Sequence, residues 1–215
     1  MGFKKNLDVI IQEKLQEFIL RGEWTPGQAI NIDELVQFFN VSRTPVVQAL
    51  KHMAALGMVT TSSAGHYFVL AFTQKQVKDL LEMRLLLEKQ AILDIERNKK
   101  DIDLHSLKVI AEKCILYNNT NDVVLTRKMD LLFHKMLVEQ ADNHCMNELY
   151  KRVQSQFMVA NYLLTSHTVA QQIVASDDHV KIIQALEKKM YNSAIKEIEE
   201  HIEGALEKII VKMGR

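Results

Sequence analysis

The amino-acid sequence predicts a mainly α protein, with an N-terminal winged helix-turn-helix followed by a C-terminal all-α antiparallel helical bundle. The first observation is the placement of helix breakers, because both prolines, Pro26 and Pro45, lie in the first quarter of the chain. The second is that apolar residues beyond the first third recur at helical spacing, and Gly204 alone interrupts them before the last two residues. We therefore expect two domains, residues 1–72 and residues 73–215.

The N-terminal part begins with a predicted helix and a second, shorter one. The first runs from about Leu7 to Leu20, along an apolar stripe that Gly22 stops, and a Pro-Gly turn follows it. The second spans IDELVQFF, because Asn31 is a good N-cap, Glu34 occupies the capping-box position and Asn40 is a C-terminal stop.

A third helix is expected over residues 42–56, with Ser42 as its N-cap, Pro45 in its first turn and Gly57 at its end. With the preceding short helix and the tight turn between them, it makes a helix-turn-helix. The segments MVTTSS and HYFVLAF alternate as two short strands around a Ser-Ala-Gly turn. This hairpin is the wing of a winged helix.

The third helix is the expected reader of the DNA major groove. Residues 1–72 carry six basic and six acidic side chains, so their net charge gives no argument for nucleic acid. No acidic residue lies between Val41 and Met58, however, and this leaves a locally positive face that attracts phosphate. An arginine at the helix start can reach a guanine edge, and hydroxyls beside free backbone amides can hold phosphate. The predicted contacts on this helix are Ser42, Arg43, Thr44, Gln48 and Lys51. The alternative is a winged helix that contacts only proteins.

Four residues of the helical part are the most informative for chemistry. Asp130 and His134 lie four apart in a helical pattern, so both side chains can reach one point. His179 begins the apolar run HVKIIQAL, and His201 lies in a later helical run. Taken singly, each histidine is also explained as a surface or hydrogen-bonded residue. Taken together, one carboxylate and three neutral imidazoles suit Zn, Ni, Mn or Fe and leave positions open for a ligand.

The helical part divides into six predicted helices, which place the four candidate ligands on the third, fifth and sixth. The expected bounds are 74–98, 103–118, 122–141, 143–166, 169–190 and 192–212. The fifth is expected to break near Ala175-Ser176, where Ser176 or Asp177 can cap a new start. A bundle of this kind can direct side chains from several helices into one buried cavity.

Composition excludes several classes of protein. The longest apolar stretches are short and broken by charge, so no membrane-spanning helix and no membrane partner are expected. The first fifteen residues carry charge inside an amphipathic pattern, which is not typical of a signal peptide. Cys114 and Cys145 are too few for a disulfide framework. A cytoplasmic protein is the simplest interpretation.

The segment PGQAINIDELVQFFNVSRTPVVQALKHMAALGMV resembles the winged helix of the GntR family. The matching residues are Pro26-Gly27, Val41-Ser42-Arg43-Thr44-Pro45-Val46, Ala49-Leu50 and Gly57-Met58-Val59. The second half resembles the FCD effector domain of the FadR subfamily, through VKDLLEMRLLLEKQAI, DLLFHKMLVEQADN and two late histidines 22 residues apart.

The resemblance implies a DNA-binding transcriptional regulator, which we expect to be a repressor. It implies a homodimer on an imperfectly palindromic operator, and a small organic acid bound at a metal held by Asp130, His134, His179 and His201. We expect Zn or Ni, with Mn and Fe as alternatives. Arg84 is the candidate for the far end of the effector, and its alternative role is an i,i+4 surface pair with Glu88. Asn161 and Tyr162 are further candidates for effector contacts.

Two departures from the family pattern concern DNA. The arginine that usually follows Thr-Pro-Val is replaced by Val47, and the wing tip, which commonly carries Arg-Gly, reads Ser-Ser-Ala-Gly-His. DNA binding would then depend more on Gln48, Lys51 and His66. These departures motivate the main alternative, a metabolite or metal sensor with weak or no specific DNA binding. A metal-dependent enzyme is a further alternative, for which the sequence offers neither a general base beside the ligands nor a nucleophile motif.

Overall fold

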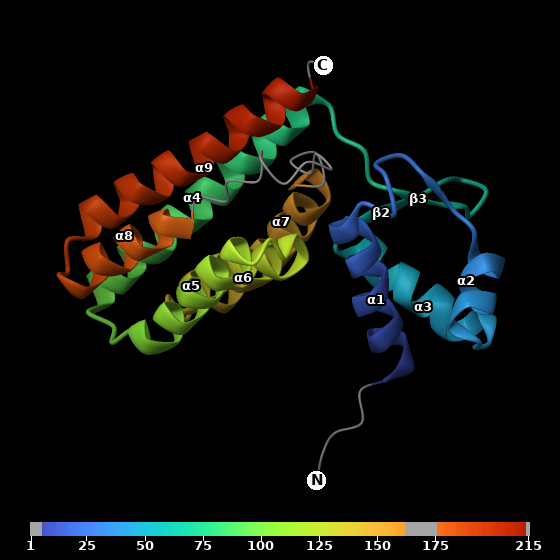
Figure 1. The fold of residues 1–215 in the computed structure, drawn as a ribbon, viewed down its shortest axis with the longest axis horizontal. Helices are drawn as coiled ribbons and strands as arrows, with labels where there is room; N and C mark the ends of the chain where they lie inside the picture. Colours follow the sequence, from blue (N-terminus) through green and yellow to red (C-terminus); the bar gives the residue numbers. More distant parts are fainter. Residues whose placement is uncertain (1–5, 162–175, 214–215) are drawn as a thin grey trace, which may run out of the picture.

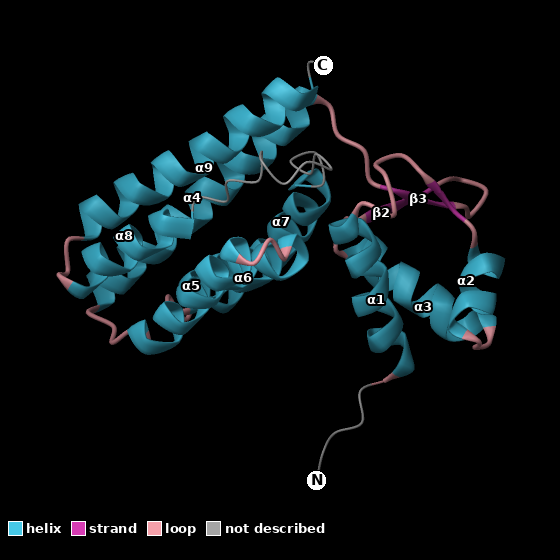
Figure 2. Ribbon diagram, in the orientation of Figure 1, coloured by secondary structure: helices cyan, strands magenta, loops and turns pink. Residues whose placement is uncertain are grey.

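The computed structural model describes residues 6–161 and 176–213 of the chain, and helices dominate both segments (Figure 1). Within these residues, strands occur only in the N-terminal part, and the rest form long helices joined by short loops (Figure 2). Two large hydrophobic clusters accompany this division, one centred on the first part and one on the second. The predicted class, a winged helix-turn-helix followed by a helical bundle, is confirmed.

The N-terminal part contains three helices and three short strands. In chain order they are α1 (Leu7–Arg21), β1 (Ala29–Ile30), α2 (Ile32–Phe39), α3 (Arg43–Ala55), β2 (Val59–Thr61) and β3 (Tyr67–Val69). The predicted positions of the three helices and of the β2–β3 hairpin are therefore confirmed. Helix α3 packs against α1 and α2 through fully buried residues such as Leu15, Ile19 and Leu50.

Local signals in the sequence explain where these helices begin and end. Gly22 caps α1 with a φ of 73°, a left-handed conformation that glycine adopts without strain. The Asn31 side chain accepts hydrogen bonds from two backbone amides at the start of α2. The carboxylate of Glu34 accepts from the side-chain amide of Asn31. In the predicted capping box it would accept from the backbone N–H of Asn31 instead. Ser42 occupies the N-cap position of α3, but its side chain makes no capping hydrogen bond.

The sheet has one more strand than the predicted hairpin. Its order is β1-β3-β2 and both pairings are antiparallel, with Ile30 opposite Tyr67 and Thr60 opposite Phe68. Strand β1 has only two residues, between the Pro-Gly turn and the N-cap of α2. A segment this short cannot show an alternating pattern, which is why the sequence did not predict it.

The C-terminal part contains six described helices. They are α4 (Gln74–Asn98), α5 (Leu104–Asn119), α6 (Val123–Glu139), α7 (His144–Asn161), α8 (Ser176–Glu187) and α9 (Tyr191–Met213). The bounds of α4 are those predicted, and α5, α6 and α9 begin and end within two residues of expectation. Helix α8 is described from Ser176 onward, and residues 162–175 lie outside the described residues. The predicted break near Ala175-Ser176 and the predicted end of the preceding helix therefore stay predictions.

The long helices lie side by side, as Figure 1 shows for α4, α8 and α9. Helix α5 packs against both α6 and α8, and α4 also packs against α6 and α7. Phe133, Leu137 and Ile182 are fully buried in the core between these helices. Within the described residues, no helix combines the length and the apolar character needed to cross a bilayer.

The two parts contact each other through α1, α6 and α7. Lys128 of α6 pairs with Glu17 of α1 at 2.6 Å, and the buried Arg127 donates from Nη1 to the carbonyl oxygen of Leu20 at 2.9 Å. On α7, Met158 and Val159 belong to the hydrophobic cluster of the N-terminal part. Helix α6 therefore packs in the core of the C-terminal part and makes polar contacts with α1 of the N-terminal part.

Gly57, directly after α3, is a second point of contact with α7. Its φ is +71°, and a Cβ built there would lie 2.4 Å from Nε2 of Gln156. We expect Gly57→Ala to lower the free energy of unfolding by about 1–2 kcal/mol, because an L-residue is strained in this conformation. Thermal or urea denaturation of the purified protein measures the change.

Gly204 is the matched control, because it lies inside α9 and an added Cβ would meet nothing within 4 Å. Gly204→Ala is expected to stabilise the protein by about 0.5–1 kcal/mol. Adding Gln156→Ala to Gly57→Ala should recover only the steric part of the loss. Equal stability of Gly57→Ala and the wild type would contradict the prediction.

Candidate metal centre

The four predicted ligands meet in the interior of the helical part. Asp130 and His134 lie one turn apart on α6, His179 lies on α8 and His201 on α9. His134 and His179 are fully buried, and the other two side chains are nearly so. The i,i+4 spacing brings the α6 pair together, as expected from the sequence. Packing of α8 and α9 brings the remaining two from 45 and 67 residues further along the chain than His134.

The four donor atoms all lie within 4.8 Å of one another, and five of their six separations are 3.0–3.7 Å. Nε2 of His134 lies 3.0 Å from Nε2 of His201 and 3.2 Å from Nε2 of His179. Oδ1 of Asp130 lies 3.3 Å from Nε2 of His179 and 3.7 Å from Nε2 of each of the other two imidazoles. In a tetrahedral site with metal–ligand bonds of ~2.0–2.1 Å, ligand atoms lie about 3.3 Å apart. The donor set and its spacing therefore fit a divalent metal ion.

The protonation states in the pocket also suit a ligand role. Burial lowers the pKa of His179 to about 4 and lowers the pKa of His201, which keeps both imidazoles neutral at neutral pH. Burial opposes ionisation of Asp130, yet the adjacent imidazoles of His134 and His179 hold its pKa well below the ordinary value. For His134, burial and Arg84 oppose protonation, but two nearby carboxylates raise its pKa. A bound cation would compete with a proton at this imidazole.

A buried carboxylate, Glu88 of α4, lies behind His134. Its Oε2 is 2.7 Å from Nδ1 of His134, and its Oε1 accepts from Nε of Arg84 at 2.7 Å and from the hydroxyl of Tyr150 at 2.6 Å. Burial opposes its ionisation, but the combined effect of His134 and Arg84 lowers the pKa of Glu88. The sequence did not identify Glu88 or Tyr150 as part of this site, and for Tyr150 it contains no local signal.

The position of Arg84 corrects one of the two roles considered for it. Arg84 does pair with Glu88, but both side chains are fully buried, so the surface-pair interpretation is wrong. The guanidinium carbon stacks 4.2 Å from the ring centre of Phe157, and Nη2 is buried with no hydrogen-bond partner in the described part of the chain. Oδ1 of Asn161 is likewise buried and unpartnered, while Tyr162 lies outside the described residues. A buried, unpaired N–H of a cation is an expected partner for an anionic ligand.

The predicted DNA contacts all lie at the surface of the N-terminal part. The exposed side chains are Ser42, Arg43, Thr44, Gln48, Lys51 and, in the wing, His66. Five of them are on or next to α3, as expected. The sequence did not reveal that the guanidinium of Arg43 pairs with the carboxylate of Asp33, in the first turn of α2.

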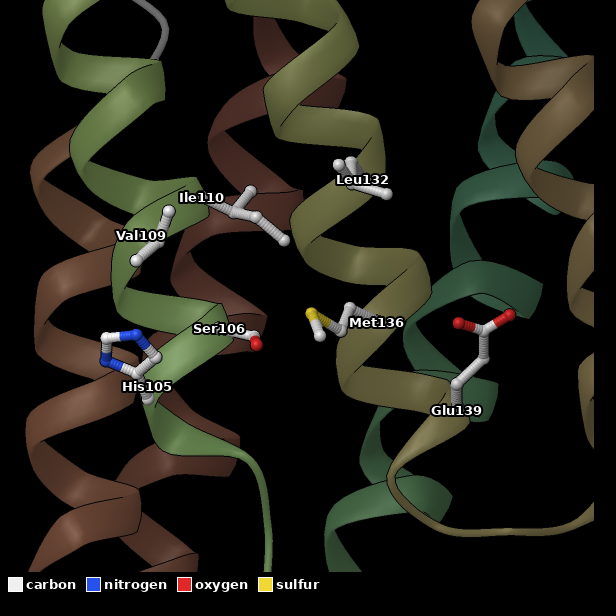
Figure 3. A pocket seen from close by; sticks show the side chains of 7 residues that line it. All are labelled: His105, Ser106, Val109, Ile110, Leu132, Met136 and Glu139. Atoms are coloured by element: carbon white, nitrogen blue, oxygen red, sulfur yellow. The ribbon is translucent and has the colours of Figure 1, made fainter. Parts of the chain in front are cut away.

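A groove of about 420 Å³ lies elsewhere on the helical part. Figure 3 shows its walls, with His105, Ser106, Val109 and Ile110 on α5 facing Leu132, Met136 and Glu139 on α6. None of the four candidate ligands lines it, because Leu132 and Met136 point away from the face of α6 that carries Asp130 and His134. The groove is therefore separate from the metal centre.

Comparison with protein families matches both parts of the chain. Residues 9–69 match the model of the bacterial regulatory proteins of the gntR family, and residues 79–204, more than half of the chain, match the FCD domain. All four candidate metal ligands and Glu88 fall inside the FCD match, and the exposed face of α3 falls inside the other.

Curated relatives cover most of the chain at low identity. The uncharacterized HTH-type transcriptional regulator YdhC of Bacillus subtilis is 23% identical over 193 residues, which is 87% of this chain and 84% of the relative. The gluconate operon transcriptional repressor of the same organism is 24% identical over 206 residues, covering 85% and 82%. These relatives are described as transcriptional regulators, so the comparisons support a regulator rather than an enzyme.

Solved structures share the fold. Escherichia coli McbR/YncC superposes with a TM-score of 0.82 at 17% identity, covering 97% of this chain and 99% of that one. Lar, which controls expression of the Listeria monocytogenes agr system, superposes with a TM-score of 0.66 at 18% identity, covering 98% and 99%. At this level of identity the likeness establishes the fold alone.

Removing one ligand tests the metal centre. We expect Asp130→Ala or His134→Ala to weaken divalent-metal binding by more than the ~10–100-fold that loss of an outer hydrogen bond causes, because each variant lacks one of four donors. Metal content after dialysis and a competitive titration with a chelating dye measure the loss. His105→Ala, at the exposed wall of the groove, should bind like the wild type. Unchanged stoichiometry in both ligand variants would refute the assignment.

Proposed function

The chain belongs to the GntR family of bacterial regulatory proteins with a C-terminal FCD domain and is a DNA-binding transcriptional regulator, and from this premise we propose a metabolite-responsive repressor. In this proposal Asp130, His134, His179 and His201 hold a divalent metal, Zn or Ni in the first place, and a small carboxylate binds there. The observation that carries it is the buried convergence of three imidazole nitrogens and one carboxylate oxygen within 4.8 Å, with five of the six separations at 3.0–3.7 Å.

The effector would occupy the space between the metal and the first helix of the FCD domain. Its carboxylate, or a hydroxyl beside it, would complete the coordination of the ion, since four protein donors leave room for one or two more ligands. We assign its far end to Arg84, whose buried Nη2 has no partner, and a neutral contact to Asn161. Tyr162 stays a candidate by sequence alone.

The operator would be read by the exposed face of α3 and by the wing. We assign guanine recognition to Arg43, phosphate contacts to Ser42 and Thr44, and further contacts to Gln48, Lys51 and His66. Residues 1–72 would form the DNA-binding domain, and residues 73–215 the domain that binds the effector and dimerises. A homodimer in the cytoplasm would recognise an imperfect palindrome, because two equivalent reading helices contact two half-sites.

Helix α6 offers a physical route between the two sites. It carries Asp130 and His134, and one turn earlier Arg127 holds the carbonyl at the end of α1. Helix α1 in turn packs against the reading helix α3. Occupation of the metal centre can change the position of the N-terminal DNA-binding part only if the metal favours one placement of α6 over another. The contacts from α6 through α1 to α3 would then carry that change.

The second candidate function is a sensor that has lost specific DNA binding. Two observations favour it: Val47 stands where the family pattern has arginine, and Arg43 is already paired with Asp33. Both reduce the number of cations available to DNA. The match to the gntR family model and the exposure of all six assigned contacts favour the repressor.

Selection of genomic fragments by the purified protein, with and without chelator, tests the proposed repressor. We expect enrichment of a palindromic site whose footprint changes when the metal is removed. Affinity for that site should fall steeply with salt, because contacts to phosphates release counterions. No enrichment at low salt with metal present would contradict the repressor and favour the sensor.

Arg127→Met tests the route through α6. The wild type is expected to change operator affinity by about 5–150-fold between metal-loaded and metal-free forms, the usual range of allosteric coupling. Arg127→Met should bring this ratio close to one while metal affinity stays the same. Lys128→Met is the control, because the Lys128–Glu17 pair on the same interface is partly exposed and contributes little. An undiminished ratio in Arg127→Met would exclude this route.

A further inference from the structure

Glu88 receives three hydrogen bonds at a place closed to water. Its side chain is fully buried, as are those of its partners Arg84, Tyr150 and His134. These partners come from α4, α7 and α6, with donor–acceptor distances of 2.6–2.7 Å. A buried carboxylate with this many short bonds is fixed in position, because any rotation would leave a buried donor unsatisfied.

The two oxygens of Glu88 have different partners. Oε1 accepts from Nε of Arg84 and from the hydroxyl of Tyr150, whereas Oε2 faces only Nδ1 of His134. An ionised carboxylate is an acceptor only, so the hydrogen in the last contact belongs to the imidazole. His134 therefore carries a hydrogen on Nδ1.

This assignment determines the other nitrogen of the ring. In a neutral imidazole with a hydrogen on Nδ1, Nε2 has a free lone pair. Nε2 of His134 is the atom that lies 3.0 Å from His201 and 3.2 Å from His179 at the centre of the candidate site. The bond to Glu88 thus directs the lone pair of His134 to the place where the metal would lie.

The other two imidazoles lack an equivalent contact. Nδ1 of His201 is 3.5 Å from Oδ2 of Asp178, which is longer than an ordinary hydrogen bond, and that carboxylate is partly exposed. Nδ1 of His179 has no hydrogen-bond partner among the residues that the structure describes. Among the three imidazoles, His134 alone has its tautomer fixed by a short, buried bond.

We propose that Glu88 is a positioning residue of the metal centre, which holds His134 in the tautomer and orientation needed to bind a metal ion. Tyr150 and Arg84 do not contact Nδ1 of His134 themselves. They donate hydrogen bonds to Glu88 and so fix the carboxylate that orients the imidazole. This inference rests on the metal centre of the proposed function, but the state of His134 in the metal-free protein tests it separately.

Glu88→Gln makes a sharp test because glutamine has one acceptor oxygen where glutamate has two. If that oxygen faces Arg84 and Tyr150, the amide N–H groups face His134, which must then accept at Nδ1 and carry its hydrogen on Nε2. The reverse orientation would set amide hydrogens against the buried Arg84 cation, which costs more. We therefore expect the substitution to reverse the tautomer of His134 and to point an N–H at the metal position.

Nitrogen-15 NMR of histidine-labelled, metal-free protein at alkaline pH, where His134 is neutral, distinguishes the two tautomers. The signals of His134 are identified by their loss in His134→Ala. The wild type should show a hydrogen on Nδ1, and Glu88→Gln a hydrogen on Nε2. Titration with zinc alone, against a chelating dye, should show affinity about 10–100-fold weaker in Glu88→Gln.

Two further variants separate positioning from a general loss of structure. Glu88→Asp keeps two acceptor oxygens, so it should retain the wild-type tautomer and lose less zinc affinity than Glu88→Gln. Asp178→Asn removes the carboxylate near His201 and should change zinc affinity by less than Glu88→Gln does, because that contact is long and partly exposed. Circular dichroism confirms that each variant keeps its helices.

The outcomes are distinguishable from those of the proposed function. If the wild-type protein binds no zinc, the proposed metal centre fails, while the tautomer of His134 still decides the role of Glu88. A hydrogen on Nε2 in the wild type would overturn the inference without any variant. It would also be overturned if Glu88→Gln kept both the wild-type tautomer and the wild-type zinc affinity.

Discussion

Burial of Asp130 among three imidazoles is the constraint on which the arrangement of the C-terminal helices depends. A lone carboxylate in this interior would cost several kcal/mol, so its polar partners must lie close to it. They come from α6, α8 and α9, which are held together at this point by polar contacts as well as by apolar packing. Phe133, next to the site, stacks on His179 with ring centres 4.2 Å apart and excludes water from one side.

The same constraint extends outward through Glu88 to two more helices. Glu88 brings α4 to the back of His134, and Tyr150 adds α7, so five helices share one connected set of buried polar groups. Nearly every donor in this set has an acceptor, which is what makes burial tolerable. The exceptions among the described residues of this set are Nη2 of Arg84 and the Nδ1 atoms of His179 and His201, which are buried without a hydrogen-bond partner.

Helix α6 belongs to both parts of the molecule, and this gives the proposed regulation a physical basis. Its later turns supply Asp130 and His134, while Arg127 and Lys128 fasten the preceding turn to α1. Arg127 is buried, and burial lowers its pKa to about 10 because the cation has lost contact with water. Loss of its bond to the Leu20 carbonyl would leave this desolvated cation without that acceptor, which costs free energy. A small displacement of α6 must therefore be matched by α1, against which the reading helix α3 packs.

The sequence alone determined the features that depend on neighbours along the chain. Caps, glycine stops and 3.6-residue periodicity predicted nearly every described helix, and i,i+4 spacing paired Asp130 with His134, because these signals act within one or two turns. The meeting of His179 and His201 with that pair was a hypothesis from the residue types, which resemblance to a family strengthened. The tertiary structure alone decided that Arg84 and Glu88 are buried, that Tyr150 completes their network and that Asp33 holds Arg43. These contacts join residues on different helices, and the packing of whole helices, which no local pattern encodes, sets their distances.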